Sequence, residues 1–172
     1  MELEAWIERV WDDLKADVPM LAIRNEADLK CHLFSRLHAS KIASNIEIHS
    51  EVNFPLDSRN SRVRVDLVVA IDSHVEAAIE LKYWDYPKFE KDYRNLRRLS
   101  DAVAVNDCIF NARFSSSKGH SKPLKLSSSS RFYYGSACAK DASSASDGGI
   151  VERIGEQPKI KNLPAIVFSE VK

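Results

Sequence analysis

The stretch of sequence that decides the fold reads RVRVDLVVAI over residues 62–71 and VEAAIELKYW over residues 75–84. Both segments are rich in β-branched and other aliphatic residues, a composition that favours strands. Residues 72–74 separate them, and three residues is a common length for the loop of a hairpin. The sequence therefore predicts an antiparallel hairpin whose register places Asp66 opposite Glu80.

Asp66 interrupts the run of residues 65–71, which otherwise consists of valine, leucine, alanine and isoleucine. A carboxylate in such a strand costs several kcal/mol unless it is paired or bound to a cation. In the predicted register the Cβ atoms of Asp66 and Glu80 lie about 5 Å apart, where two carboxylates would repel each other. A bridging cation removes that repulsion, and carboxylate oxygens suit Mg²⁺ or Mn²⁺, which also accept phosphate oxygens of a substrate. The pair therefore predicts a divalent-metal site.

Lys82 shares a strand face with Glu80 because side chains alternate, and the register places it across from Arg64. A lysine beside a metal-bound water can orient or help to deprotonate that water, and it can stabilise charge on the attacked phosphate. Glu26 lies on the apolar stripe of a helix expected to follow Asn25, so it is expected to point inward and bind the metal or its water. The candidate catalytic residues are Asp66, Glu80, Lys82 and Glu26.

The spacing of apolar residues predicts the elements around this hairpin. Helices are expected over residues 2–14, from Asn25 onward and over 87–100; strands are expected over 46–54, over 102–110 with a turn at residues 106–107, and over 165–169. In the strand over 46–54, the residues expected to share one side are Ile46, Ile48, Val52 and Phe54. Residues 115–149 contain twelve serines and show weak periodicity, so a flexible loop is predicted there.

The composition favours a single globular domain spanning residues 1–172. Apolar residues make up 44% of the chain, enough for a core, and no apolar run is long enough to span a bilayer. The acidic N-terminus lacks the pattern of a secretion signal, and the spacing of Cys31, Cys108 and Cys138 is not that of metal ligands. A cytoplasmic protein with reduced thiols and no membrane association is therefore expected.

These features together resemble the PD-(D/E)XK nuclease superfamily, which includes many restriction endonucleases, Holliday-junction resolvases and repair nucleases. The resemblance rests on Val65-Asp66, on Glu80-Leu81-Lys82 and on the preceding helix with Glu26. It covers the chain from residue 25 to about residue 110. It implies an α/β, restriction-endonuclease-like core, in which helices flank a mixed central β-sheet in the order α-β-β-β-α-β.

The same resemblance implies roles for four residues: Asp66 and Glu80 as metal ligands, Lys82 as the catalytic lysine and Glu26 as an accessory acid. The chain departs from the family pattern at two places. Val65 stands where the family has proline, a position that carries no chemistry. The helix after the hairpin contains Asp92-Tyr93-Arg94 instead of the Gln-x-x-x-Tyr pattern of RecB-like members, so membership of that subgroup is not implied.

Basic residues gather near the predicted site although the whole chain, with 25 basic and 25 acidic residues, has no net charge. Local basic patches contact phosphate whatever the total charge. The candidate nucleic-acid contacts are Lys88, Arg94, Arg97, Arg98, Lys118 and Lys122. The expected activity is that of an endodeoxyribonuclease, in restriction, phage defence, transposition or repair. A homodimer or a larger nucleoprotein complex would suit an enzyme that cuts both strands.

Other interpretations of these residues stay open at this point. Asp66 could pair with Arg62 or Arg64 for structural reasons alone, and Glu80 with Lys82 could form a solvated strand face. Glu51 could provide a second metal ligand, whereas Glu26 could simply favour the start of a helix through its dipole. The fold could also serve as an inactive module that binds nucleic acid or a protein partner, and an active site of this kind could cut RNA.

Overall fold

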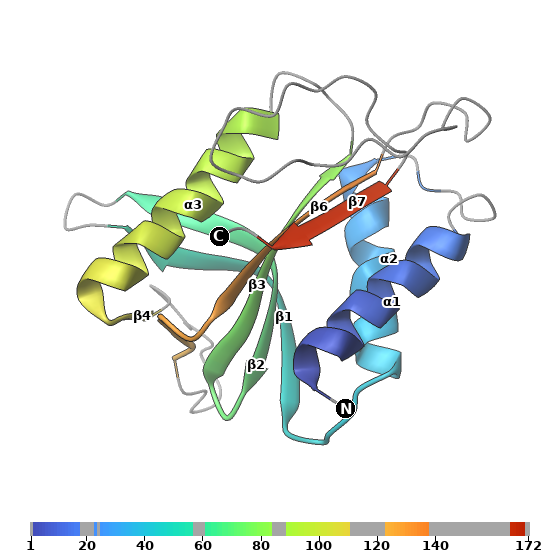
Figure 1. Ribbon diagram of the computed structural model, residues 1–172, viewed down its shortest axis with the longest axis horizontal. Helices are drawn as coiled ribbons and strands as arrows, with labels where there is room; N and C mark the ends of the chain where they lie inside the picture. Colours follow the sequence, from blue (N-terminus) through green and yellow to red (C-terminus); the bar gives the residue numbers. More distant parts are fainter. Residues whose placement is uncertain are drawn as a thin grey trace, which may run out of the picture.

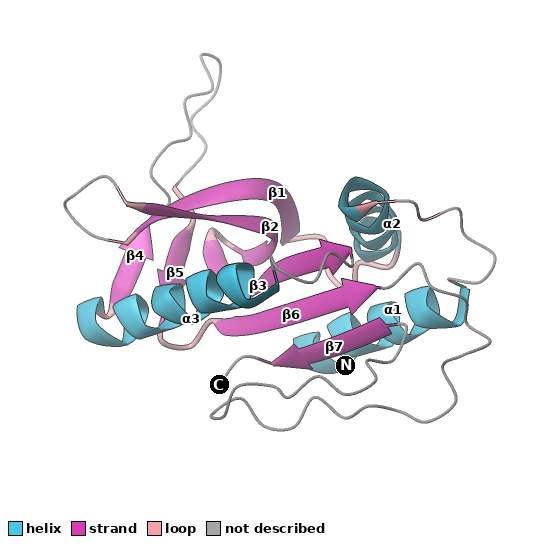
Figure 2. Ribbon diagram, turned by 90° about the horizontal axis from the view of Figure 1, so that it is seen from above, coloured by secondary structure: helices cyan, strands magenta, loops and turns pink. Residues whose placement is uncertain are grey.

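The computed structural model describes residues 2–17, 23, 25–56, 61–83, 89–110, 123–137 and 166–170. Its elements are α1 (Leu3–Asp17), α2 (Glu26–Ala39), β1 (Ile46–Pro55), β2 (Arg62–Ile71), β3 (His74–Tyr83), α3 (Phe89–Asn106), β4 (Cys108–Phe110), β5 (Lys125–Ser127), β6 (Arg131–Ala137) and β7 (Ile166–Glu170). The strands form a mixed sheet, with α1 and α2 against one face and α3 against the other (Figure 1, Figure 2). The predicted α/β class is confirmed, and the elements from α2 to β4 follow the predicted order.

The sheet is antiparallel on one side of β3 and parallel on the other. β2 pairs antiparallel with both β1 and β3. Along the other edge of β3, β6 runs parallel over the whole of its length, while β5 joins the same edge at His74. β4 and β7 are the antiparallel partners of β5 and β6. Helices cover both faces of β2, which explains why every residue from 65 to 70 is buried.

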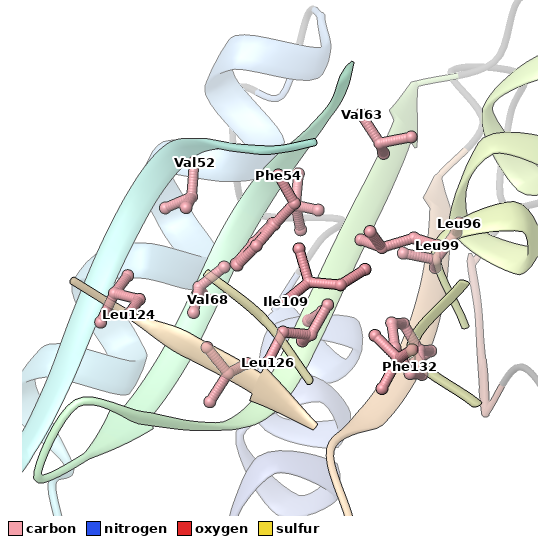
Figure 3. Packing of buried hydrophobic residues seen from close by; sticks show 14 of the residues in the cluster. Val52, Phe54, Val63, Val68, Leu96, Leu99, Ile109, Leu124, Leu126 and Phe132 are labelled. Atoms are coloured by element: carbon pink, nitrogen blue, oxygen red, sulfur yellow. The ribbon is translucent and has the colours of Figure 1, made fainter. Parts of the chain in front are cut away.

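Two hydrophobic cores lie on opposite faces of this sheet. The core beside α3 includes Leu96, Leu99 and Val103 of that helix, which pack on side chains of β1 to β6 (Figure 3). The core beside α1 and α2 is built around Trp6 and Leu33 together with β2, β3 and β6. Since both faces carry a core, a charged side chain inside the sheet is removed from water in either direction.

The hairpin between β2 and β3 has the predicted register, but its turn differs from the predicted one. The turn contains two residues, Asp72 and Ser73, with φ of 49° and 70°, as favoured in tight hairpins. The pairing then shifts where Val69 and Ala70 face β3, and this bulge leaves Glu76 as the additional residue. The three-residue loop was therefore wrong, but the bulge compensates for the missing residue.

The apolar residues of β1 pack in one core at the start of the strand and in the other core at its end. Ile46 packs in the core beside α1 and α2, whereas Val52 and Phe54 pack in the core beside α3. The change occurs at Glu51, which has φ of 56° and lies opposite Asp66 in the strand register. The prediction that all these apolar residues share one side was wrong, because a left-handed residue within the strand reverses the alternation.

α3 is longer than predicted and absorbs residues that were assigned to a strand. Val103 continues the buried helical stripe of Leu96 and Leu99, so residues 102–105 remain helical. Asp107, with φ of 60°, follows the end of the helix, and β4 begins at the next residue. The strand prediction thus holds for residues 108–110 alone. Among the described residues, no helix has the length and apolar character needed to cross a membrane.

The serine-rich segment contains two strands, so the prediction of a continuous flexible loop over residues 115–149 was wrong. β5 and β6 both lie within it. Ser130 links this segment to β3. Its hydroxyl donates to the Val75 carbonyl at 2.6 Å and accepts from the Ser127 N–H at 2.9 Å. Phe132 adds apolar burial in the core beside α3. Residues 115–122 and 138–149 lie outside the described residues.

Candidate active site

The predicted acidic pair lies where β2 and β3 separate. The hairpin ladder ends at the pair Leu67–Ile79, so Asp66 and Glu80 occupy the next position in the same register. The ladder does not continue to Arg64 and Lys82. Beyond its end, the Asp66 carboxylate Oδ2 accepts a hydrogen bond from the Leu81 backbone N–H at 2.9 Å. The Asp66 side chain therefore accepts a hydrogen bond from β3 at a point where the backbone ladder between the two strands has ended.

Asp66 is held in a buried position by two different contacts. It is 5% exposed, and its Oδ1 lies 3.4 Å from Lys30 Nζ on α2. Burial raises the pKa of Asp66, while the hydrogen bond from Leu81 and the charge of Lys30 oppose that rise only in part. The structural alternative in which Asp66 pairs with Arg64 is not realised, since the Arg64 Nε contacts Glu51 at 2.9 Å.

Glu80 is the least compensated acid of the site. Burial raises its pKa to about 9, and the charges of Asp66 and Asp92 act in the same direction. A hydrogen bond to the Asp66 backbone counteracts part of this rise. The other carboxylate oxygen, Oε2, is buried and has no hydrogen-bond partner among the described residues. An unsatisfied buried oxygen of this kind calls for a proton or a cation.

Lys82 lies between two carboxylates that come from opposite faces of the sheet. Its Nζ is 2.9 Å from Glu26 Oε2 on α2 and 2.7 Å from Asp92 Oδ2 on α3. Burial alone would lower the pKa of Lys82, but the bonds to Asp92 and Glu26 outweigh that effect and raise it. The lysine is therefore held as an ammonium, which can donate hydrogen bonds but cannot take up a proton.

Glu26 reaches the site in the manner predicted for the start of α2. The Asn25 side chain caps this helix by accepting from the Asp28 N–H at 2.9 Å, and this cap places Glu26 at the first residue of α2. The Glu26 carboxylate contacts Lys82. Within the described ranges, no three His, Cys, Asp or Glu side chains are grouped closely enough to hold a metal ion, so Glu26 adjoins the acidic pair without completing a ligand set.

A second lysine, Lys30, was missed by sequence reasoning. Its ammonium contacts Glu51 in addition to Asp66. The left-handed backbone of Glu51 lies opposite Asp66, and the two carboxylates share this one cation. The available signal was its position four residues after Glu26, since side chains at that spacing lie on the same helix face. Glu80 is thus the one acid of the cluster that the described residues leave without a lysine contact.

Asp92 was also missed, although its helix was predicted. It occupies the first turns of α3 and is anchored by the buried Leu96 and Leu99 that follow. Nothing in the local sequence distinguishes it from the neighbouring acids, because its proximity to Lys82 depends on how α3 packs across the sheet. Its contact to Lys82 is the shorter of the two that this ammonium makes.

α3 carries three of the predicted nucleic-acid contacts. Arg94, Arg97 and Arg98 are exposed on the helix that also carries Asp92. The remaining nucleic-acid contacts predicted from the sequence, Lys88, Lys118 and Lys122, lie outside the described residues. Comparison of the chain with models of known families, with curated proteins and with solved structures finds no match.

Proposed function

We propose that this protein is a divalent-metal-dependent nuclease with a restriction-endonuclease-like core that hydrolyses phosphodiester bonds of DNA. The observation that carries the proposal is the buried Asp66 beside the half-buried Glu80 at the separation of β2 and β3, with Lys82 on the same strand as Glu80. The order of elements from α2 to β4 supports membership of the PD-(D/E)XK superfamily, because the conserved order of that superfamily is the same.

The chemistry of the acidic pair suits Mg²⁺ or Mn²⁺. Glu80 offers a buried oxygen that has no hydrogen-bond partner among the described residues, and Asp66 lies beside it with a second carboxylate. Both cations prefer such oxygen ligands and fill their other positions with water and phosphate. When bound, the metal would lower the pKa of a water molecule and neutralise charge on the phosphate.

The protein's own contribution lies in the ammonium of Lys82. Glu26 and Asp92 each accept one of its hydrogen bonds, and an ammonium has three donors. No further acceptor for this ammonium is found among the described residues, so the third N–H is assigned to a non-bridging phosphate oxygen or to the attacking water. Since the bonds to Asp92 and Glu26 raise the pKa of Lys82, this residue stabilises negative charge and orients the water instead of serving as the base.

The substrate assignment to DNA rests on α3. Its arginines Arg94, Arg97 and Arg98 are exposed on the helix whose Asp92 contacts Lys82, and we assign phosphate contacts to them. Phosphate contacts fix the position of a nucleic acid without reading its sequence. Restriction, phage defence, transposition and repair are all settings that such a deoxyribonuclease could serve, as a homodimer or within a larger complex.

Cleavage assays test this proposal directly. The protein is incubated with supercoiled, linear, branched and single-stranded DNA and with RNA, in Mn²⁺ or in a chelator. Asp66→Ala and Lys82→Ala are expected to reduce metal-dependent cleavage on the order of 10²–10³-fold, the cost of removing a group that stabilises the transition state. The matched controls Asp101→Ala and Lys91→Ala replace exposed residues of α3 and should retain activity. Normal cleavage by either site variant would refute the proposal, and cleavage of RNA alone would redirect it to a ribonuclease.

An inactive nuclease-fold module is the second candidate, and Lys30 is the observation that favours it. Its ammonium contacts both Asp66 and Glu51 and offsets part of their charge, which reduces the need for a metal. Calorimetric titration with Mn²⁺ separates the two functions. Binding that disappears in Glu80→Gln supports the nuclease, whereas absence of binding to the unaltered protein supports the module.

A further inference from the structure

Lys82 requires partners because it is a long side chain with its charge inside the protein. Its side chain is 9% exposed. An ammonium in such surroundings is stable only when acceptors surround it. The two acceptors differ in character: the Glu26 side chain is 38% exposed and that of Asp92 is 21% exposed. Asp92 is therefore the more enclosed of the two, in addition to making the shorter contact.

The backbone around Asp92 is also well anchored. Leu96 and Leu99 of the same helix are 1% and 0% exposed in the core beside α3. The packed turn that follows Asp92 holds the backbone of this residue beside Lys82.

We propose that Asp92 is a positioning residue that holds the Lys82 ammonium in the orientation needed to contact the phosphate. This inference rests on the proposed nuclease function. Asp92 does not touch the substrate; it acts through Lys82. Its loss should therefore change the rate of the chemical step and leave substrate and metal binding in place.

The first test compares steady-state cleavage by the full-length protein and its variants. Asp92→Asn should lower kcat by up to about 10²-fold, the cost of a misplaced catalytic group, while KM and the Mn²⁺ titration change less than about twofold. Asp92→Glu should recover part of kcat. Asp101→Asn, an exposed acid on the same helix, is the matched control. In a Lys82→Met background the loss caused by Asp92→Asn should vanish, because the two residues act as one unit.

The second test measures the lysine itself and does not depend on activity. Brief acetylation with an amine-reactive ester, read by mass spectrometry, should label Lys82 several-fold faster in Asp92→Asn than in the unaltered protein. Lys91 and Lys125 are internal controls whose labelling should not change. Equal labelling of Lys82, or equal kcat in an active pair of proteins, overturns the inference. An unaltered protein without any metal-dependent cleavage overturns the proposed function, and labelling then still decides whether Asp92 holds Lys82.

Discussion

At the scale of single residues, the site is defined by how unequally its charges are compensated. Lys30 contacts Asp66 and Glu51, and Lys82 contacts Glu26 and Asp92. Glu80 receives a hydrogen bond from the Asp66 backbone, no lysine within the described ranges contacts it, and its pKa rises to about 9. The position that most needs a cation is therefore the one that a divalent metal would occupy in the proposed enzyme.

The raised pKa of Glu80 predicts how stability depends on pH in the absence of metal. Between its ordinary value of 4.5 and about 9, the folded state keeps a proton that the unfolded state has released. Stability should therefore be highest at acidic pH and decrease as pH rises through this range. Urea denaturation with a chelator should show a flatter pH dependence for Glu80→Gln. Glu76→Gln on the same strand should keep the slope of the unaltered protein; the same slope in Glu80→Gln would contradict the prediction.

At the scale of elements, departures from regular strand geometry create the site. The left-handed Glu51 reverses the faces of β1, and the bulge at Glu76 adjusts the register of β3. β2 and β3 separate beyond the pair Leu67–Ile79. The Leu81 backbone N–H therefore donates to the Asp66 carboxylate. Regular pairing would have satisfied that N–H within the sheet and left the acid without this bond.

Close packing between β6 and α1 makes a second prediction at this scale. A Cβ on Gly135 would lie 2.8 Å from Cη2 of Trp11 and 3.0 Å from Cδ2 of Leu81. Gly135→Ala should therefore destabilise the protein by about 1–3 kcal/mol, as overpacking does, although alanine normally suits a strand better than glycine. Urea denaturation measures the change, with the exposed Ala104→Ser as control. A stability equal to that of the unaltered protein would show that α1 yields at this contact.

At the scale of the whole molecule, the site depends on both faces of the sheet. α2 delivers Glu26 and Lys30 from one side, while α3 delivers Asp92 from the other. Each helix is held by its own core, and the acids meet where the sheet opens. This arrangement couples the site to global folding, because loss of either core would remove one side of it.

This coupling predicts that a bound metal stabilises the entire fold. A ligand that binds the folded state alone at one hundred times its Kd adds about 2.7 kcal/mol to the free energy of unfolding. Mn²⁺ should therefore raise the melting temperature of the unaltered protein in a concentration-dependent manner. Asp66→Asn should abolish this increase, whereas Asp72→Asn in the hairpin turn should retain it. An equal increase in both variants would place the cation elsewhere.

The sequence by itself determined the features that neighbouring residues encode. Alternation in β3 predicted that Glu80 and Lys82 share a strand face, and the position of Asn25 predicted the start of α2, because strand faces and helix ends depend on local chemistry. The register of Asp66 with Glu80 was predicted from a three-residue loop that does not form, and it holds because of the bulge in β3. The candidate residues of the site were largely accessible in this way, and the mixed α/β class followed from the order of the elements.

Only the tertiary structure decided which charges neutralise each other. Lys30 joins Asp66, and Asp92 joins Lys82, through contacts between residues distant along the chain or on opposite faces of the sheet. The strands within the serine-rich segment likewise form because β3 offers them an edge. Such features arise from long-range packing, which no periodicity in a single segment records, and they determine which acids of the described residues share a lysine.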